Sequence, residues 1–190
     1  MKNTYIRIGI AVVVIALIGG GIWWFTRSKA PVVSDALHAT ESIAPLASVS
    51  PLAITYSTPP SDWKTYSSAS MDFLVAYPSD WTYASCGTGC VGWAPPTATN
   101  GQLALGIVKS TTKLATVIEQ AKPYLAKNEQ VKIGAYTWTK LTLQHPTTGD
   151  IVTSYFIAHG SSLYEFGTAT SDTSILAVYG QMLASFKFLK

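Results

Sequence analysis

Charged residues are scarce in this sequence. Asp, Glu, Lys and Arg make up 12% of its 190 residues, about half the share usual in globular proteins. Arginine is missing altogether after residue 60, where nine lysines face eight acidic residues. Proteins that bind nucleic acid displace phosphate counterions with clustered Lys and Arg. The nearly neutral second part of the chain therefore excludes nucleic acid as an expected partner.

Cysteine and histidine are also few. Cys86 and Cys90 are the only cysteines and are separated by Gly-Thr-Gly. An isolated pair in an exported domain most simply forms a local disulfide, and the glycines let so short a loop close. Zinc would need two further ligands, and His38, His145 and His159 do not have metal-ligand spacing. We expect a disulfide and neither metal nor cofactor, with a zinc site or free thiols as the alternatives.

Catalytic motifs are missing as well. The sequence contains no Gly-x-Ser-x-Gly, no phosphate-binding glycine motif and no His-Glu-x-x-His, the short patterns that mark several enzyme classes. Serine is abundant, so composition alone does not exclude a Ser-His-acid hydrolase. His145 and His159 would be its only histidine bases in the domain, and His159 lies in a sequence typical of a turn. We assign no catalytic residue and predict that the chain is not an enzyme.

One long hydrophobic run is present. Ile8 to Phe25 contains 18 residues without a charge or a strongly polar side chain, enough for a helix to cross a hydrocarbon core of about 30 Å. Trp23 and Trp24 would lie in the interfacial aromatic belt. We predict a transmembrane anchor over residues 1–27. The alternatives are a buried core helix and a cleaved secretory signal, and the length of the run disfavours a signal.

The direction of the anchor does not follow from its flanking charges. Lys2 and Arg7 precede the run, while Arg27 and Lys29 follow it, so the positive-inside count is near parity. The short N-terminal tail and the downstream cysteine pair favour a signal-anchor orientation. We expect a single-pass protein of the cell membrane with its C-terminal domain outside the cytoplasm.

A linker is expected over residues 28–60. The segment is rich in Ala, Ser, Pro and Thr, contains five prolines and has only two acidic residues. Each proline removes a backbone donor and biases the preceding residue toward extended geometry. The sequence therefore predicts a flexible, semi-extended spacer.

Residues 61–190 have the pattern of one compact domain. Alternating apolar side chains predict strands, and apolar side chains at helical spacing predict two helices. The expected strands are 71–77, a piece from Trp81, 103–108, 130–133, 136–144, 151–158 and 163–169, and the expected helices are 114–125, capped by one of residues 110–112, and 171–186. Short turns between strands, with two helices covering one face, predict an α+β domain with a twisted, mainly antiparallel sheet.

Three short segments carry a family resemblance. The domain has Trp-Lys-Thr-Tyr at 63–66, Tyr-Pro-Ser-Asp-Trp at 77–81 and Ser-Phe-Lys-Phe at 185–188. These segments resemble the PsbP/Mog1-like superfamily over roughly residues 61–190. The resemblance implies an α/β/α-like sandwich with a twisted antiparallel sheet and a non-catalytic binding or assembly role. Asp72 stands where the family usually has glycine, and no functional residues carry over, because the matching positions are structural.

The tryptophans of the domain have two interpretations. Trp63, Trp81, Trp93 and Trp138 are expected in the core and at its rim, and Trp81, Trp93 and Trp138 could instead form a binding surface for a sugar or peptide. Exposed rings would favour the second interpretation.

Three functions are compatible with these observations. The preferred one is a membrane-anchored, non-enzymatic envelope module that binds a protein, a peptide or a small ligand. The second is a structural or assembly component of a membrane complex. The third is an envelope hydrolase.

Overall fold

The computed structural model describes residues 51–98, 103–144, 146, 149, 151–168, 170 and 172–189. The predicted anchor, and the predicted linker up to residue 50, lie outside the described residues, so both stay predictions. Within the described ranges, no helix combines the length and the apolar character that crossing a membrane requires.

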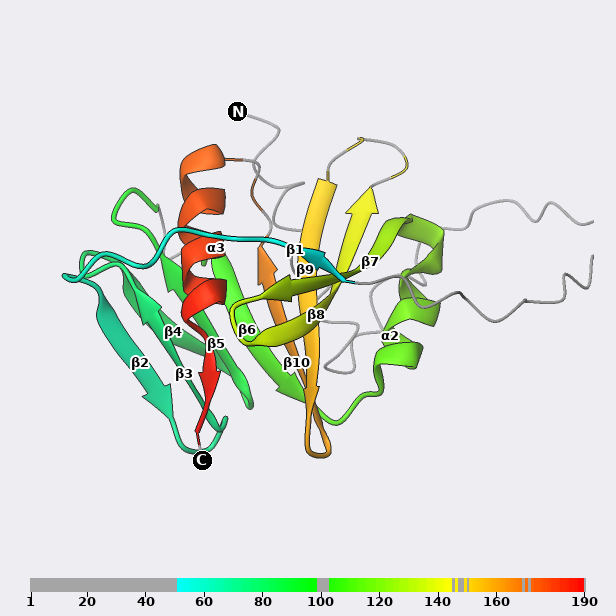
Figure 1. Ribbon diagram of the computed structural model, residues 1–190, viewed down its shortest axis with the longest axis horizontal. Helices are drawn as coiled ribbons and strands as arrows, with labels where there is room; N and C mark the ends of the chain where they lie inside the picture. The colour runs from blue at the N-terminus through cyan, green and yellow to red at the C-terminus, as the bar shows by residue number, and fades with distance from the viewer. Residues whose placement is uncertain are drawn as a thin grey trace, which may run out of the picture.

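An eight-stranded sheet forms the body of the domain, in the order β1-β7-β8-β9-β10-β6-β5-β4 (Figure 1). Its strands are β1 (Leu52–Ala53), β4 (Thr82–Gly87), β5 (Cys90–Ala94), β6 (Leu105–Ser110), β7 (Leu125–Ile133), β8 (Tyr136–Gln144), β9 (Ile151–His159) and β10 (Ser162–Thr168). The short β1 runs parallel to β7, and the other pairs are antiparallel. The sheet is therefore mixed, and mostly antiparallel.

A second, three-stranded sheet has the order β11-β3-β2. It consists of β2 (Lys64–Ser68), β3 (Phe73–Tyr77) and β11 (Lys187–Phe188). The long helix α3 (Thr173–Ser185) leads directly into β11, and its N-cap is Asp172, whose carboxylate accepts a 2.8 Å hydrogen bond from the amide of Ser174. The helix therefore begins close to residue 171, where the sequence predicts it.

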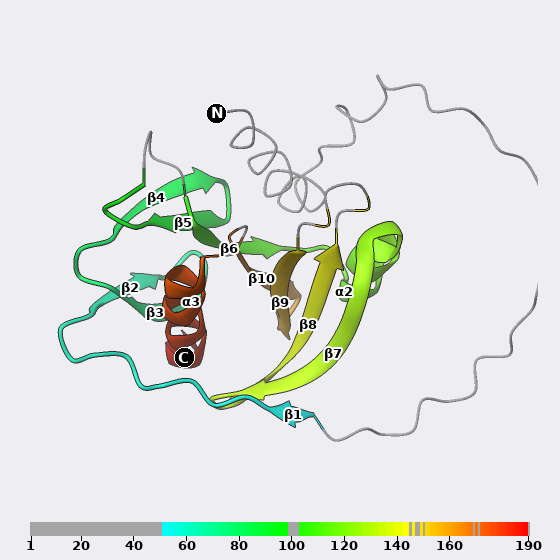
Figure 2. The same cartoon turned by 90° about the horizontal axis from the view of Figure 1, so that it is seen from above.

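The large sheet curves around α3 and the small sheet (Figure 2). The main core fills this concave side, and its largest fully buried side chains include Trp93, Trp138, Phe73 and Phe166. The helix α2 (Leu114–Ala121) lies on the outer side, where Val117 packs with a smaller cluster of apolar side chains that includes Leu163.

The two helices therefore cover opposite faces of the large sheet, and the expectation that both cover one face is wrong. Successive residues of β10 show this, because Leu163 packs with the α2 cluster while Tyr164 belongs to the main core with α3. Consecutive side chains of a strand point to opposite faces. The physical reason is the curvature: one helix and the small sheet fill the concave side, and the outer face needs its own cover.

The helix α2 begins at Leu114 as predicted, but its N-cap and its C-terminal end differ from the prediction. Ser110 is the last residue of β6, and the N-cap position of the helix is Lys113, without a side-chain hydrogen bond. The predicted Ser or Thr cap is therefore wrong. The helix ends at Ala121 instead of residue 125, because Pro123 lies in a single 3₁₀ turn (Lys122–Tyr124) directly after it and proline disfavours the interior of a helix.

The described end of the predicted linker lies along the domain. Leu52 and Ala53 pair with β7, and the amide of Ile54 donates to the carbonyl of Lys132 at 2.9 Å. Tyr56 packs against the main core, with its hydroxyl 3.2 Å from that of Tyr155. A strand of two residues has too little alternation for a sequence pattern to show it.

Candidate functional site

The tryptophans proposed for a binding surface are in the core. Trp93 and Trp138 are 0% exposed and Trp81 is 8% exposed. The indole Nε1 atoms of Trp93 and Trp138 are buried, and no described residue accepts a hydrogen bond from either. All three belong to the cluster on the concave side, where α3 and the small sheet cover them. None of these three rings faces solvent. They are therefore core residues and do not form a binding surface.

The two cysteines are joined by a disulfide that ties β4 to β5. Their Cα atoms are 5.1 Å apart, and the turn between them has positive φ at Gly87 and Gly89, 135° and 69°. Glycine reaches such angles without a steric penalty, as the sequence analysis expected for so short a loop. The bond closes the end of a hairpin in which Tyr83 pairs with Trp93.

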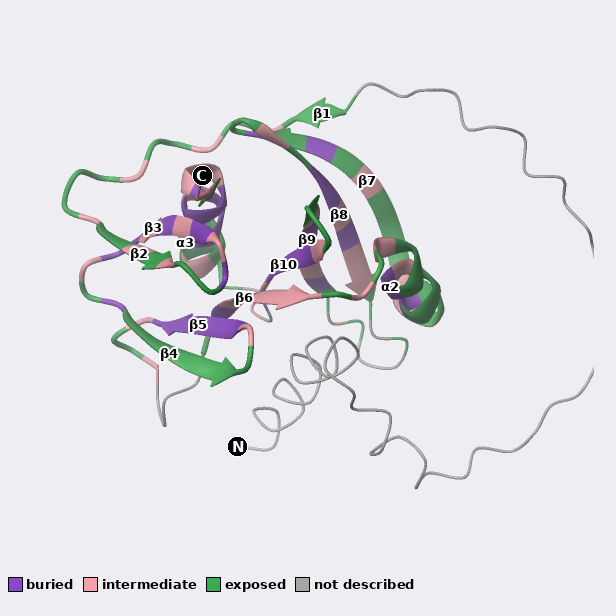
Figure 3. Cartoon of the chain, turned by 90° about the horizontal axis from the view of Figure 1, so that it is seen from below, coloured by how far each residue is buried: buried purple, intermediate pink, exposed green. Residues whose placement is uncertain are grey.

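The strand β4 is the last strand of the large sheet, and it is exposed along its whole length (Figure 3). Among the described strands only β5 pairs with it, so its outer edge offers backbone donors and acceptors. Its sequence, Thr-Tyr-Ala-Ser-Cys-Gly, carries no charge. Soluble proteins usually protect exposed edges with charges or proline, because an open edge is a template for another strand. An uncharged, regular edge over residues 82–85 is therefore a candidate interaction site.

Tyr83 adds an aromatic side chain to this edge. It is 53% exposed, and its ring makes edge contacts with Tyr66 and Tyr77, at centroid distances of 5.0 and 5.9 Å. Burial, with a smaller contribution from Tyr83, raises the pKa of Tyr77, so this phenol is neutral at physiological pH. Supported exposed tyrosines are frequent hot spots of protein interfaces. We call Thr82 to Ser85 with the Tyr83 ring the β4 edge.

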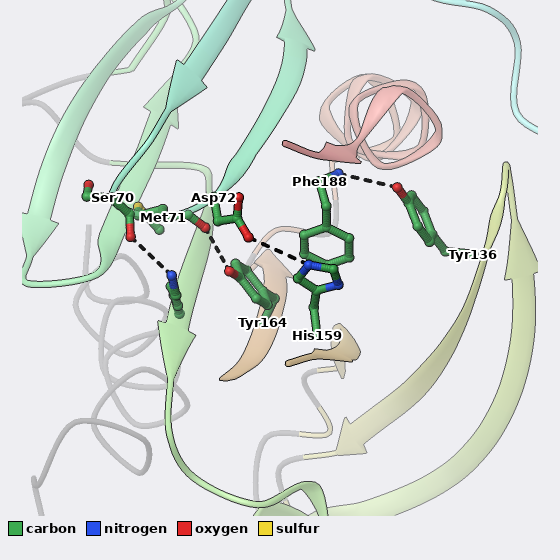
Figure 4. Close-up of polar contacts among 8 residues, drawn as sticks. Ser70, Met71, Asp72, Tyr136, His159, Tyr164 and Phe188 are labelled. Carbon is green, nitrogen blue, oxygen red and sulfur yellow. Dashed lines mark hydrogen bonds and ion pairs between the residues drawn. The ribbon is translucent and has the colours of Figure 1, made fainter. Parts of the chain in front are cut away.

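A second group of side chains gathers where the small sheet meets the large one (Figure 4). The ring of His159 stacks on Phe188 with centroids 3.8 Å apart, and its Nε2 lies 3.6 Å from Oδ2 of Asp72. The hydroxyl of Tyr164 donates to the carbonyl of Met71 at 2.8 Å. These contacts join the turn before β3, the end of β9 and the C-terminal strand β11, and His159 is the last residue of β9 instead of a turn residue.

His159 thus has the contacts of a packing residue. One face of its ring is covered by Phe188, and its partner Asp72 belongs to a turn whose carbonyl accepts the amide of Leu189 at 3.2 Å. A catalytic base needs a nucleophile within hydrogen-bond reach, and the described hydrogen bonds give His159 none. His38 and His145 lie outside the described residues. Among the side chains that are described, no group of three His, Cys, Asp or Glu could hold a metal ion.

Sequence reasoning did not single out the β4 edge. It placed Tyr83 in an extended segment but gave no reason to find it exposed, because that depends on the strand order. The strand β5, Cys-Val-Gly-Trp-Ala, is buried throughout, whereas its equally uncharged partner β4 is exposed. The signal that separates them is topological, since β6 covers the other edge of β5.

Comparisons with known proteins give structural neighbours only. No protein-family model matches the chain, and no curated protein matches it. The solution structure of a cyanobacterial PsbP, CyanoP of Synechocystis, is 14% identical with a TM-score of 0.47, and the match covers 76% of this chain and 99% of that one. LpqN of Mycobacterium tuberculosis, described as involved in cell envelope biogenesis, is 11% identical with a TM-score of 0.39, covering 72% and 89%.

A third neighbour is a protein of Bacteroides thetaiotaomicron, 19% identical with a TM-score of 0.44, where the match covers 68% of this chain and 49% of that one. This chain therefore spans about half the length of the Bacteroides protein. The structural neighbours of the chain therefore include a PsbP and LpqN.

Proposed function

We propose that this chain is a membrane-anchored, non-enzymatic envelope module that binds an extended segment of a partner protein along the β4 edge. The observation that carries the proposal is the exposed, uncharged edge strand, held in place by a disulfide. A strand from a partner would satisfy the outer backbone groups of β4 and extend the large sheet. This is the mode of peptide recognition called β-augmentation.

The composition of the edge indicates the kind of segment that fits. Residues 82–87 contain no charged side chain, and Tyr83 presents an amphipathic ring. An uncharged strand with an apolar side chain beside Tyr83 complements this edge, because a charged side chain would lose solvation there without a partner. Specificity would come from the alternate side chains that reach Tyr83, and affinity from the backbone.

The disulfide and the anchor support the location. A cysteine pair that forms a stable disulfide is typical of oxidising compartments, and the hydrophobic run at 8–25 has the length of a membrane span. In sealed vesicles of native orientation, an impermeant reductant followed by an impermeant maleimide should label Cys86 without lysis. Labelling only after lysis would contradict the outside placement and leave the binding proposal standing.

The binding proposal is tested with displayed random peptides selected on the full chain in detergent micelles. Selected peptides should slow amide hydrogen exchange in residues 82–85. Tyr83→Ala should lower the affinity for these peptides at least about tenfold, as expected for an interface hot spot. The matched control is Leu176→Ala, which removes an exposed apolar side chain of α3 and should leave the affinity unchanged. Failure to select any peptide, or protection elsewhere with no effect of Tyr83→Ala, would refute the proposal.

A further inference from the structure

Three glycines occupy neighbouring register positions in the middle of the large sheet. Gly92 of β5 pairs with Gly106 of β6, and Gly106 pairs with Gly167 of β10. Ala84 of β4 and Ser154 of β9 continue the same row. Five adjacent strands thus contribute nothing larger than a serine at this level. We call Gly92, Gly106 and Gly167 the glycine row.

The row lies on the outer face of the sheet. Gly167 and Glu165 are on the same face of β10 as Leu163, which packs with the α2 cluster, since side chains two apart share a face. Leu103 covers the Gly92 end, because a Cβ at Gly92 would lie 2.5 Å from its Cδ1. At Gly106, the described atoms within 4 Å of such a Cβ are backbone only, the carbonyl oxygen of Val91 at 3.2 Å and the Cα of Gly92 at 3.8 Å.

Glu165 leans over the other end of the row. Its Oε1 lies 3.3 Å from the position of a Cβ on Gly167, and it accepts a 2.8 Å hydrogen bond from the hydroxyl of Ser154. The residue is 3% exposed, and its Oε2 is buried and has no hydrogen-bond partner among the described residues. A buried carboxyl oxygen without a partner is costly, and the carboxyl group that carries it lies over Gly167, with its Cδ 3.8 Å from the position of a Cβ there.

The surroundings of the carboxyl are apolar. Its register neighbours are Val108 of β6 and Phe156 of β9, and Leu163 lies on the same face of its own strand. Burial raises the pKa of Glu165 from 4.5 to about 7, although the hydrogen bond from Ser154 lowers it. A ligand that supplies a charged donor would stabilise the ionised form, because opposite charge and hydrogen bonding both favour it.

We propose that the glycine row and Glu165 form a second binding site, for a slender aliphatic cation whose ammonium group donates to Oε2 of Glu165. The alkyl chain would lie on the backbone at Gly106, where no side chain projects, and it would pack against the apolar side chain of Val108. The carboxyl supplies the complement to the charge. This site goes beyond the proposed function, because it lies on the sheet face and uses none of the β4 edge.

The test uses pentylammonium as the probe and pentanol as its neutral match. The full chain, labelled with ¹⁵N-glycine, is titrated in zwitterionic micelles. Pentylammonium should shift the amide signals of Gly106 and Gly167 saturably in the millimolar range, while pentanol should not. Glu165→Gln should weaken the binding about tenfold, the effect of losing one charge-assisted hydrogen bond.

Two further variants make the test specific. Glu119→Gln removes an exposed carboxylate of α2 that pairs with Lys122 and should leave the titration unchanged. Gly106→Ala places a methyl group on the row without touching the carboxyl, and it should abolish binding even if Glu165→Gln fails to fold. Equal shifts with pentanol, no saturation, or undiminished binding by both site variants would overturn the proposal, whereas peptide binding at the β4 edge would be unaffected.

Discussion

Asp72 combines an unusual backbone with two contacts. Its φ of 60° is the only positive value among the described non-glycine residues, at a position where the resembling family usually has glycine. Aspartate tolerates the left-handed region better than most residues, because its short side chain can bond locally. Its carbonyl accepts from Leu189 and its carboxylate lies near His159, so the strained turn also holds the end of the chain.

Replacing Asp72 separates the backbone requirement from the side-chain contact. Asp72→Ala should lower the free energy of unfolding by about 1 kcal/mol, because alanine disfavours this conformation, and Asp72→Asn should change it by less than about 0.5 kcal/mol, because an exposed ion pair contributes little. Urea unfolding followed by tryptophan fluorescence measures both. A larger loss for Asp72→Asn than for Asp72→Ala would show that the pair with His159 matters more than the backbone.

The disulfide between Cys86 and Cys90 stabilises the exposed strand β4 in its hairpin with β5. β4 has neighbours on one side only among the described strands, and its register shifts between Ser85 and Gly87, next to the disulfide. A strand with one partner frays more easily than a central one. The disulfide counteracts fraying at the end of the hairpin and keeps Tyr83 over Tyr66 and Tyr77.

Removing the disulfide should affect stability and the edge together. Its sequence separation is 4, and the chain-entropy model gives about 2 kcal/mol for so short a loop. The double variant Cys86→Ser, Cys90→Ser should lose about that much and exchange the amides of β4 faster than those of β9, as measured by hydrogen exchange. Leu176→Ala, an exposed position of α3 that leaves both the bond and the hairpin intact, is the control. Unchanged exchange in β4 would contradict a role of the disulfide in holding the edge.

The elements that sequence reasoning found are those with a strong period. The strands at 73–77, 136–144 and 151–159 follow from alternation, and α3 follows from apolar side chains at helical spacing. The elements it missed are β1 and β11, with two residues each, β2, which has a single apolar side chain, and β5, where apolar burial is continuous. It also missed the glycine row and Glu165. These features depend on strand order and register. A sequence pattern does not show which residues of distant strands become neighbours in the sheet.

At the scale of the whole molecule, the large sheet has two unlike faces. The concave face is filled by aromatic side chains, among them Trp93, Trp138 and Phe166, beneath α3 and the small sheet. The outer face has α2 over part of its surface and carries the glycine row with Glu165 beside it. A single strand serves both, since Glu165 of β10 lies between Tyr164 and Phe166. The fold therefore places a titratable group, the Glu165 carboxyl, within the large sheet. The packing of this sheet determines the global stability of the domain.

Glu165 should make that global stability depend on pH. Its pKa is raised from 4.5 to about 7, so between these values the folded chain holds a proton that the unfolded chain releases. The stabilisation of the fold by protonated Glu165 is fully present below about pH 4.5 and is lost as the pH rises to about 7. The free energy of unfolding changes by about 3 kcal/mol over this range. Thermal or urea unfolding of the full chain across this window measures it.

The groups around Glu165 allow the effect to be isolated. Val108, Phe156, Leu163 and Gly167 do not titrate, and burial raises the pKa of Tyr179, the nearest titratable group of α3, far above this window. Glu165→Gln keeps the shape and removes the proton, so subtracting its profile from that of the native chain cancels the other titrating groups. The difference should fall from pH 4.5 to 7. A difference that rises instead would mean that the carboxyl is ionised in the fold and already has a cationic partner.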